Sequence, residues 1–271
     1  MPNHDENWED IKGKAHSDDV FDRLASLTRS VFFLELALIA IGTHHEKYEG
    51  VTRLLNKSVL LKEFDAERIN NIRAAISARN KAVHQGEVSD PSTCYEMVGQ
   101  LFSAWVWMRN RFVTLPTAAD LADQILKSEF FHEVFLFGSL SRNKPFPGDM
   151  DLLLFDNGEI SYIGDRYGEL RYLLNRSTLE LAGVNNPAYF AALDMDWIDI
   201  VVVHYKEFVN NPEYIRKVAS AQPPYFLLGI SDGIQQYDKK TSKWLQCHSL
   251  PFKRWEAIRR ELVNEGIVSG Q

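Results

Sequence analysis

A stretch near the middle of the chain, VFLFGSLSRNKPFPGDMDLLLF, constrains the fold more than any other part of the sequence. An apolar run over residues 134–137 ends in Gly138-Ser139, and a polar loop follows. Asp149 and Asp151 then lead directly into a second apolar run over residues 152–155. Short apolar runs bounded by glycine, proline and polar residues are typical of buried strands. We therefore expect two strands joined by this loop, with two carboxylates at the entrance to the second.

The chain beyond about residue 117 alternates helical and strand patterns. The segment WIDIVVV, residues 197–203, is rich in β-branched residues and predicts a third strand. Asp232-Gly233, between two apolar runs, is a hairpin signal. Helices are expected over residues 117–129, 167–181 and 251–266.

The chain before about residue 113 shows helical patterns and no convincing strand pattern. Ser17 to Asp19 can begin a helix that ends at Gly42, with a kink or break near Ser26 or Thr28. Asp65 is placed to cap a second long helix, in which isoleucines recur at helical spacing. A third, apolar helix runs to about residue 113.

A change of pattern at TLPTAAD, around Pro116, indicates a linker. A chain of 271 residues is long enough for two ordinary domains. We therefore predict an α+β protein of two domains: an all-α helical bundle over residues 1–116, and an α/β domain with a small mixed sheet over residues 117–271.

Composition narrows the classes of function. A net charge of −7 argues against a protein that coats nucleic acid non-specifically. The two cysteines, Cys94 and Cys247, form no metal or disulfide framework. The longest apolar run, residues 31–41, carries Glu35 and is too short to span a bilayer. With no signal peptide visible, we expect a cytoplasmic protein without a membrane partner.

The aspartates of the expected strands suggest a metal site. Asp149 and Asp151 are two residues apart, so they share one face of a strand. If the strand that carries Asp199 is a neighbour, three carboxylates converge and repel one another unless cations lie between them. Mg²⁺ binds through one or two carboxylates together with substrate phosphates. We therefore expect a magnesium site that receives a nucleotide.

The turn at Gly138-Ser139 suits the phosphates of that nucleotide. A glycine lets an anion approach the backbone closely, and the N–H groups that follow a strand end can bind it. Ser139 can add a hydroxyl donor, and Arg142 and Lys144 in the loop can reach phosphate oxygens. Each of the two cations is equally compatible with a solvated surface position.

The pattern G-S-x9-D-x-D, with a later aspartate in WIDIVVV, resembles the nucleotidyltransferase fold of the polymerase-beta type, in particular the minimal nucleotidyltransferases. The resemblance implies two Mg²⁺ ions held by Asp149, Asp151 and Asp199, and transfer of a nucleoside monophosphate from ATP or another nucleoside triphosphate to a hydroxyl. Asp199 is implied as a general base as well. The usual G-S-x-A-R-G is changed here, and Asp194 and Asp196 compete for the third position.

A second candidate site lies in the helical part, where ISARNKAVHQG places Arg79 and His84 five residues apart. A guanidinium stabilises charge on a phosphate, and an imidazole moves protons near neutral pH. Attack of a 2′-hydroxyl on its neighbouring phosphate needs these two services and no metal. The simpler interpretation is a histidine that interacts with the dipole at a helix C-terminus.

Arg79, Asn80 and His84 match the R-x4-6-H signature of the HEPN domain family, which the helical part resembles. The family implies a ribonuclease site formed across a homodimer, and toxin–antitoxin pairs in which a minimal nucleotidyltransferase modifies a tyrosine just after the histidine. Here Gln85 and Gly86 follow His84, and the next tyrosine is Tyr95. The acceptor is therefore left open between protein, RNA and a small molecule.

Three functions follow from these observations. The first is a Mg²⁺-dependent nucleotidyltransferase, with AMP as the expected group transferred. The alternatives are a metal-independent endoribonuclease regulated by the C-terminal module, and a dimeric nucleotide sensor without catalysis.

Overall fold

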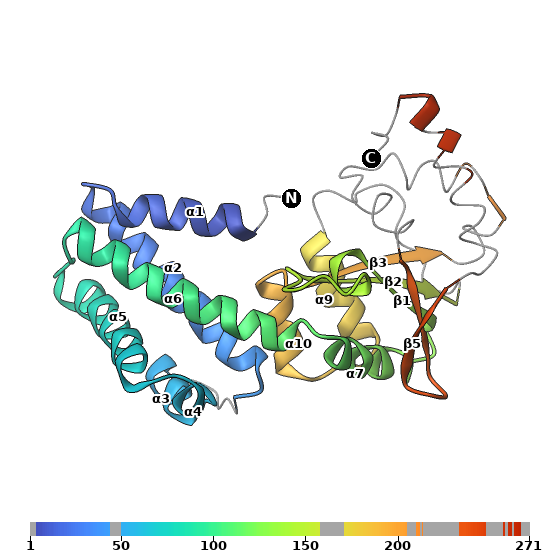
Figure 1. Cartoon of the computed structure of the whole chain (residues 1–271), viewed down its shortest axis with the longest axis horizontal. Coiled ribbons are helices and arrows are strands. Elements are labelled where there is room, and N and C mark those ends of the chain that lie inside the picture. The colour runs from blue at the N-terminus through green and yellow to red at the C-terminus, as the bar shows by residue number, and fades with distance from the viewer. Residues whose placement is uncertain are drawn as a thin grey trace. The chain divides into compact units, whose positions relative to one another are not determined.

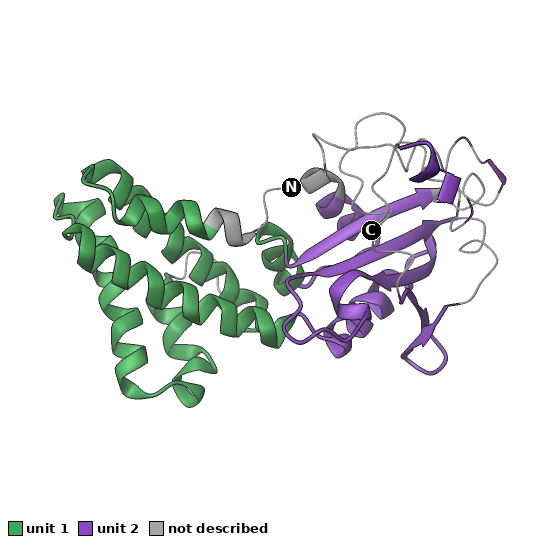
Figure 2. Cartoon of the chain, turned by 45° about the horizontal axis from the view of Figure 1, so that its top comes forward, with its two compact units in different colours: residues 1–112, 187–196 green, residues 113–186, 197–271 purple. Residues whose placement is uncertain are grey.

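The protein is α+β, with helices in the N-terminal part and a mixed five-stranded sheet in the C-terminal part (Figure 1). The computed structural model describes residues 4–43, 50–157, 171–204, 210–211, 213, 233–247, 257, 260–261 and 263–266. The chain divides into two compact units: residues 1–112 with 187–196, and residues 113–186 with 197–271 (Figure 2). Within the described residues, no helix is long and apolar enough to cross a membrane.

The first unit is built around two long apolar helices, α2 and α6, which pack against each other. Their largest buried side chains include Leu34, Leu38 and Trp105, which makes this contact the core of the unit. The helices of the unit are α1 (His4–Ala15), α2 (Val20–Ala40), α3 (Val51–Lys57), α4 (Leu60–Glu63), α5 (Ala66–Gln85), α6 (Pro91–Phe112) and α10 (Pro187–Asp194).

The predicted ends of α2 and α5 are confirmed. The Asp19 carboxylate accepts a hydrogen bond from the Phe21 N–H, and the Asp65 carboxylate accepts one from the Arg68 N–H at 2.8 Å. These caps satisfy N–H groups that have no partner within the helix. Gly86 ends α5 in the left-handed conformation, with φ of 73°.

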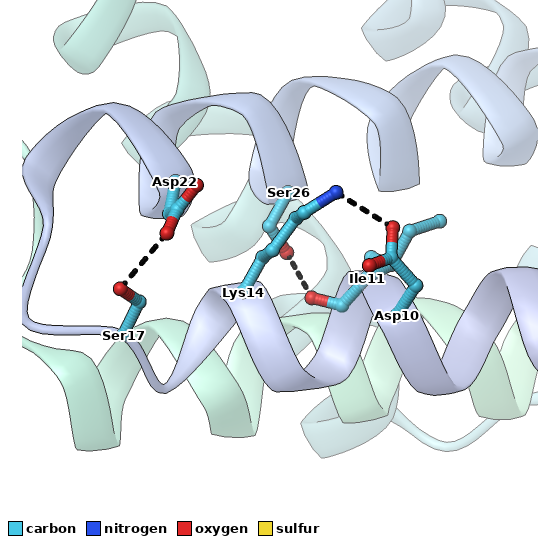
Figure 3. Close-up of polar contacts among 6 residues, drawn as sticks. All are labelled: Asp10, Ile11, Lys14, Ser17, Asp22 and Ser26. Carbon is cyan, nitrogen blue, oxygen red and sulfur yellow. Dashed lines mark hydrogen bonds and ion pairs between the residues drawn. The ribbon is translucent and has the colours of Figure 1, made fainter.

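A break in α2 near Ser26 or Thr28, one of the two alternatives expected, is excluded because the helix is continuous from Val20 to Ala40. The Ser26 hydroxyl donates to the Ile11 carbonyl of α1 at 2.6 Å instead of disturbing its own helix (Figure 3). The same region holds a Ser17–Asp22 hydrogen bond of 3.0 Å and a Lys14–Asp10 ion pair. The two serine hydrogen bonds join α1 and the turn after it to α2, while the ion pair lies within α1.

Helix α1 was not expected from the sequence. It buries Trp8 and Ile11, and the Trp8 ring lies 5.0 Å from Phe102 and 5.7 Å from both Phe33 and Trp105. Its remaining residues are largely charged or polar, and the three buried apolar residues, Trp8, Ile11 and Ala15, form only a narrow stripe. Packing, rather than propensity, holds such a helix in place.

Helix α10 follows β2 in the sequence but belongs to the helical unit, as the colours of Figure 2 show. Tyr189 and Met195 are buried there. The Trp105 Nε1–H donates to Met195 Sδ at 3.3 Å, and the Phe112 and Tyr189 rings lie 6.1 Å apart. The helical unit therefore includes a segment that lies inside the C-terminal half of the sequence.

The sheet has the strand order β3-β2-β1-β4-β5. Only β2 and β3 pair in parallel, and the other neighbours are antiparallel, so the predicted mixed sheet is confirmed. The three predicted strands are present: β1 and β2 are longer than expected, and β3 has the expected length but is shifted by one residue. The bounds are β1 (Phe131–Phe137), β2 (Met150–Asp156), β3 (Ile198–His204), β4 (Gln235–Asp238) and β5 (Lys243–Gln246).

The predicted hairpin around Asp232-Gly233 lies partly outside the described residues. The hairpin that the structure describes joins β4 and β5 instead, through a turn over residues 239–242. In that turn the Asp238 carboxylate accepts hydrogen bonds from the Lys240 N–H and the Thr241 hydroxyl. Most of the predicted C-terminal helix also lies outside the described residues.

Three helices of the second unit are described: α7 (Leu115–Ile125), α8 (Gly138–Ser141) and α9 (Arg171–Leu181). Thr114 caps α7 and Pro116 lies in its first turn, so the expected linker is part of a helix. Proline is favoured there because the first N–H groups of a helix need no partner within it. The Trp244 Nε1–H donates to the Leu115 carbonyl, and Lys239 donates to the Leu126 carbonyl, which ties α7 to the β4–β5 hairpin.

Candidate functional site

Two of the predicted carboxylates are brought together by strand register. Asp151 of β2 lies directly opposite Asp199 of β3, and Phe137 of β1 lies opposite Asp151 on the other side. Residues that oppose one another in a sheet project from the same face. The two carboxylates therefore project from the same face of the sheet. They lie at the level of Phe137, the last residue of β1, which the glycine-serine turn follows.

The backbone of Gly138 lies close to the Asp151 carboxylate. Its φ is +75°, a backbone conformation that residues with a side chain rarely adopt. A Cβ built on Gly138 would overlap Oδ2 of Asp151. Both the backbone angle and the close approach require glycine at this position. The expected glycine turn is thus in direct contact with one of the expected metal ligands.

The hydroxyl of Ser139, the residue after Gly138, is the next feature of the turn. Its Oγ is buried and has no hydrogen-bond partner in the part of the chain that is described. Buried hydroxyls are normally paired, because leaving one unpaired costs about 1–3 kcal/mol. The neighbouring Ser141 hydroxyl, in contrast, donates to the Gly138 carbonyl at 3.0 Å.

The third predicted carboxylate, Asp149, lies just outside the register. It precedes β2, which begins at Met150, and is partly buried. Its two rivals belong to the helical unit: Asp194 ends α10, and Asp196 forms a left-handed turn with φ of 50°. Within the described ranges, no group of three histidine, cysteine, aspartate or glutamate side chains is arranged to hold a metal ion.

The donors at this position suit Mg²⁺ when a nucleotide supplies the remaining ligands. Two carboxylates on one face provide the hard oxygen atoms that this ion prefers, with the substrate phosphates completing its coordination. The glycine backbone leaves room beside Asp151, and the buried Ser139 hydroxyl is ready to donate to an anion. The residues therefore fit a magnesium–nucleotide site formed by Asp151 and Asp199, with Asp149 adjacent.

The loop between the turn and β2 carries the two predicted cations. Arg142 and Lys144 are exposed, and the Lys144 N–H donates to the Ser139 carbonyl at 3.1 Å. Two non-glycine residues of this loop have left-handed backbone, Asn143 with φ of 52° and Phe146 with φ of 56°. Sequence reasoning passed over Phe146, although the Pro-Phe-Pro triplet marks it as conformationally constrained.

Glu133 is another acidic residue that sequence reasoning missed. It alternates with Phe135 and Phe137 along β1, so it projects from the same face as Asp151. Burial raises the pKa of Glu133 above the ordinary glutamate value, and its neighbour His132 lowers it only in part. The Gln236 side chain donates to Glu133 Oε1 at 3.4 Å. A glutamate within an apolar strand was the available signal.

Arg79 and His84 lie on different sides of α5. The helix turns by about 100° per residue, so five residues separate them by about 140°. Arg79 shares its side with the buried Ile72 and Ile76, and its Nε is buried without a partner in the described structure. His84 is exposed in the last turn. The two side chains therefore project in different directions from the helix.

A cavity of about 450 Å³ does lie beside α5 in the helical unit. Its walls come from α5, from the loop that follows and from Met97 of α6, and its polar lining includes Lys81, Glu87 and Ser89. Arg23 donates to the Ser89 carbonyl at 3.0 Å and so fixes this loop. Neither Arg79 nor His84 lines the cavity.

Comparisons of the chain with models of known protein families, with curated protein sequences and with solved structures give no match. The class of site is therefore defined by geometry alone: two register-paired strand carboxylates beside a glycine-serine turn.

Proposed function

We propose that this protein is a Mg²⁺-dependent nucleotidyltransferase that moves a nucleoside monophosphate, AMP from ATP in the first instance, onto a hydroxyl. The observation that carries the proposal is the pairing of Asp151 with Asp199 beside the backbone of Gly138. Two carboxylates on one face of a sheet favour the binding of positive charge beside them. A nucleotide with Mg²⁺ supplies that charge.

The side chains divide the work. Asp151 and Asp199, with Asp149, would hold Mg²⁺, which neutralises phosphate charge and makes a bound hydroxyl more acidic. The Ser139 hydroxyl donates a hydrogen bond to a phosphate oxygen and so gains a partner that it lacks among the described residues. Arg142 and Lys144 attract the triphosphate electrostatically from the exposed loop. Asp199 would also act as the general base for the acceptor hydroxyl, and positioning and charge neutralisation would account for most of the rate.

The decisive experiment measures the intact mass of the purified chain after incubation with ATP, Mg²⁺ and candidate acceptors, together with release of pyrophosphate. We expect pyrophosphate release by the wild type and its loss in Asp151→Asn and Asp199→Asn. Asp196→Asn is the matched control, because Asp196 lies outside the strand register and asparagine tolerates its left-handed backbone. Equal activity of Asp199→Asn and the wild type would refute the proposal.

A second function, a metal-independent endoribonuclease in a homodimer, is supported by the unpaired buried Nε of Arg79 and the exposed His84. Since the two residues diverge around α5, the site would combine groups from two chains. RNA cleavage that persists in EDTA and is lost in His84→Ala supports this function. A monomer in solution, or cleavage that is unchanged in His84→Ala, refutes it.

A further inference from the structure

Phe146 is an exposed aromatic residue in the loop between the glycine-serine turn and β2. Its side chain is 75% exposed, a level that only Phe21 (77%) matches among the large apolar residues described. A solvated phenyl ring stabilises no core. Its position, three residues before Asp149, places its Cα at most about 11 Å from the Cα of that aspartate.

The backbone of Phe146 is unusual in two ways. Its φ of 56° lies in the left-handed region, which large side chains rarely occupy. It also precedes Pro147, and a residue before proline prefers extended backbone. Strained conformations persist where the surroundings determine them, and they concentrate at sites that bind ligands.

Both ends of the loop are fixed to elements of the candidate site. At its beginning, the Lys144 N–H donates to the Ser139 carbonyl at 3.1 Å. At its end, the Met150 N–H donates to the Trp197 carbonyl, two residues before Asp199, at 2.9 Å. Pro145 and Pro147 stiffen the chain on either side of the ring. The loop conformation that exposes Phe146 is therefore fixed by these hydrogen bonds and prolines.

We propose that Phe146 is the stacking platform for the nucleobase of the bound nucleotide. This inference rests on the proposed nucleotidyltransferase function and adds the residue that contacts the base. An aromatic ring in the same loop as the cations Arg142 and Lys144 is the combination that proteins use to hold a base and its phosphates together. Every base has a flat face, so the platform favours nucleotides over inorganic phosphates without selecting one base strongly.

The test compares the binding of ATP and of inorganic tripolyphosphate to the full chain, by calorimetry in Mg²⁺. We expect Phe146→Ala to weaken ATP binding roughly tenfold or more, the effect of losing one base–aromatic stack, and to leave tripolyphosphate binding within about twofold. Phe146→Tyr should bind ATP nearly as the wild type does. Phe21→Ala, which removes an equally exposed ring from α2, should change neither affinity.

Phe146→Asn separates the ring from the backbone, because asparagine accepts left-handed backbone but has no aromatic face. It should weaken ATP binding as alanine does. Retained ATP affinity in Phe146→Ala or Phe146→Asn overturns the stacking role and leaves the transferase proposal standing, as does an equal loss of ATP and tripolyphosphate binding. A wild type that binds neither compound overturns both proposals.

Discussion

At the scale of single residues, the candidate site depends on the fit between Gly138 and Asp151. Gly138→Ala adds a Cβ that overlaps the Asp151 carboxylate at a φ of +75°. Gly183→Ala is the matched control, since Gly183 has φ of +71° and nothing within 4 Å of a built Cβ. We expect the control to lose about 1–2 kcal/mol from its left-handed backbone alone. Urea unfolding should show a larger loss for Gly138→Ala, together with loss of pyrophosphate release. Equal losses of stability would show that the overlap is absent.

Glu133 gives a second prediction at this scale. Its raised pKa means that the folded state binds its proton more tightly than the unfolded state, so stability falls as pH rises above the ordinary glutamate pKa of about 4.3. Glu133→Gln keeps an oxygen for the Gln236 hydrogen bond and removes the buried charge. We expect a higher melting temperature for this variant at pH 7–8, and a difference that shrinks toward pH 4. A difference that is independent of pH would contradict the assignment.

These residues also show how far sequence reasoning reaches. The caps Asp19 and Asp65 were predictable because capping is a local interaction between residues two or three apart. The placement of Asp199 opposite Asp151 followed only once β2 and β3 were assumed to be neighbours. The burial of the Ser139 hydroxyl could not be predicted, because it depends on how distant segments cover the turn.

At the scale of elements, α1 illustrates a helix that depends strongly on one large buried side chain. Trp8 is fully buried and contacts the rings of Phe33, Phe102 and Trp105. Trp8→Ala should destabilise the helical unit by about 3–5 kcal/mol, the usual cost of removing a large buried aromatic side chain. Val20→Ala, at a 45% exposed position, is the control with little expected effect. Chemical denaturation followed by circular dichroism measures both, and a cost below about 1 kcal/mol would show that α1 is not docked as described.

The local sequence pattern predicted some elements and missed others, for physical reasons. The strands over residues 134–137 and 152–155 were predicted because fully buried strands are continuously apolar. Helix α1 was missed because its apolar stripe is narrow and consists of Trp8, Ile11 and Ala15 alone. The β4–β5 hairpin was not predicted because Asp238 and Thr241 build its turn through side-chain hydrogen bonds, without an Asp-Gly pair as a signal.

At the scale of the whole molecule, the path of the chain departs most from the sequence interpretation. Residues 187–196 leave the second unit after α9, complete the helical unit, and return to begin β3. A linear boundary near Pro116 cannot describe such a path, because the pattern of α10 alone does not reveal which core it joins. Asp199 thus lies three residues beyond a segment that belongs to the helical unit.

This path predicts that the helical unit depends on α10. Tyr189→Ala removes a side chain that is 3% exposed and contacts the Phe112 ring, so it should loosen α2 and α6 in the full chain. Hydrogen–deuterium exchange followed by mass spectrometry should show faster exchange in peptides from these two helices. Glu180→Ala, at an exposed position of α9, is the control and should leave their exchange unchanged. Unchanged exchange in the Tyr189→Ala variant would mean that the helical unit is stable without this segment.

Faster exchange in β3 as well would show that the helical unit and the strand carrying Asp199 are energetically coupled through residues 195–197, because the chain there passes directly from one core to the other.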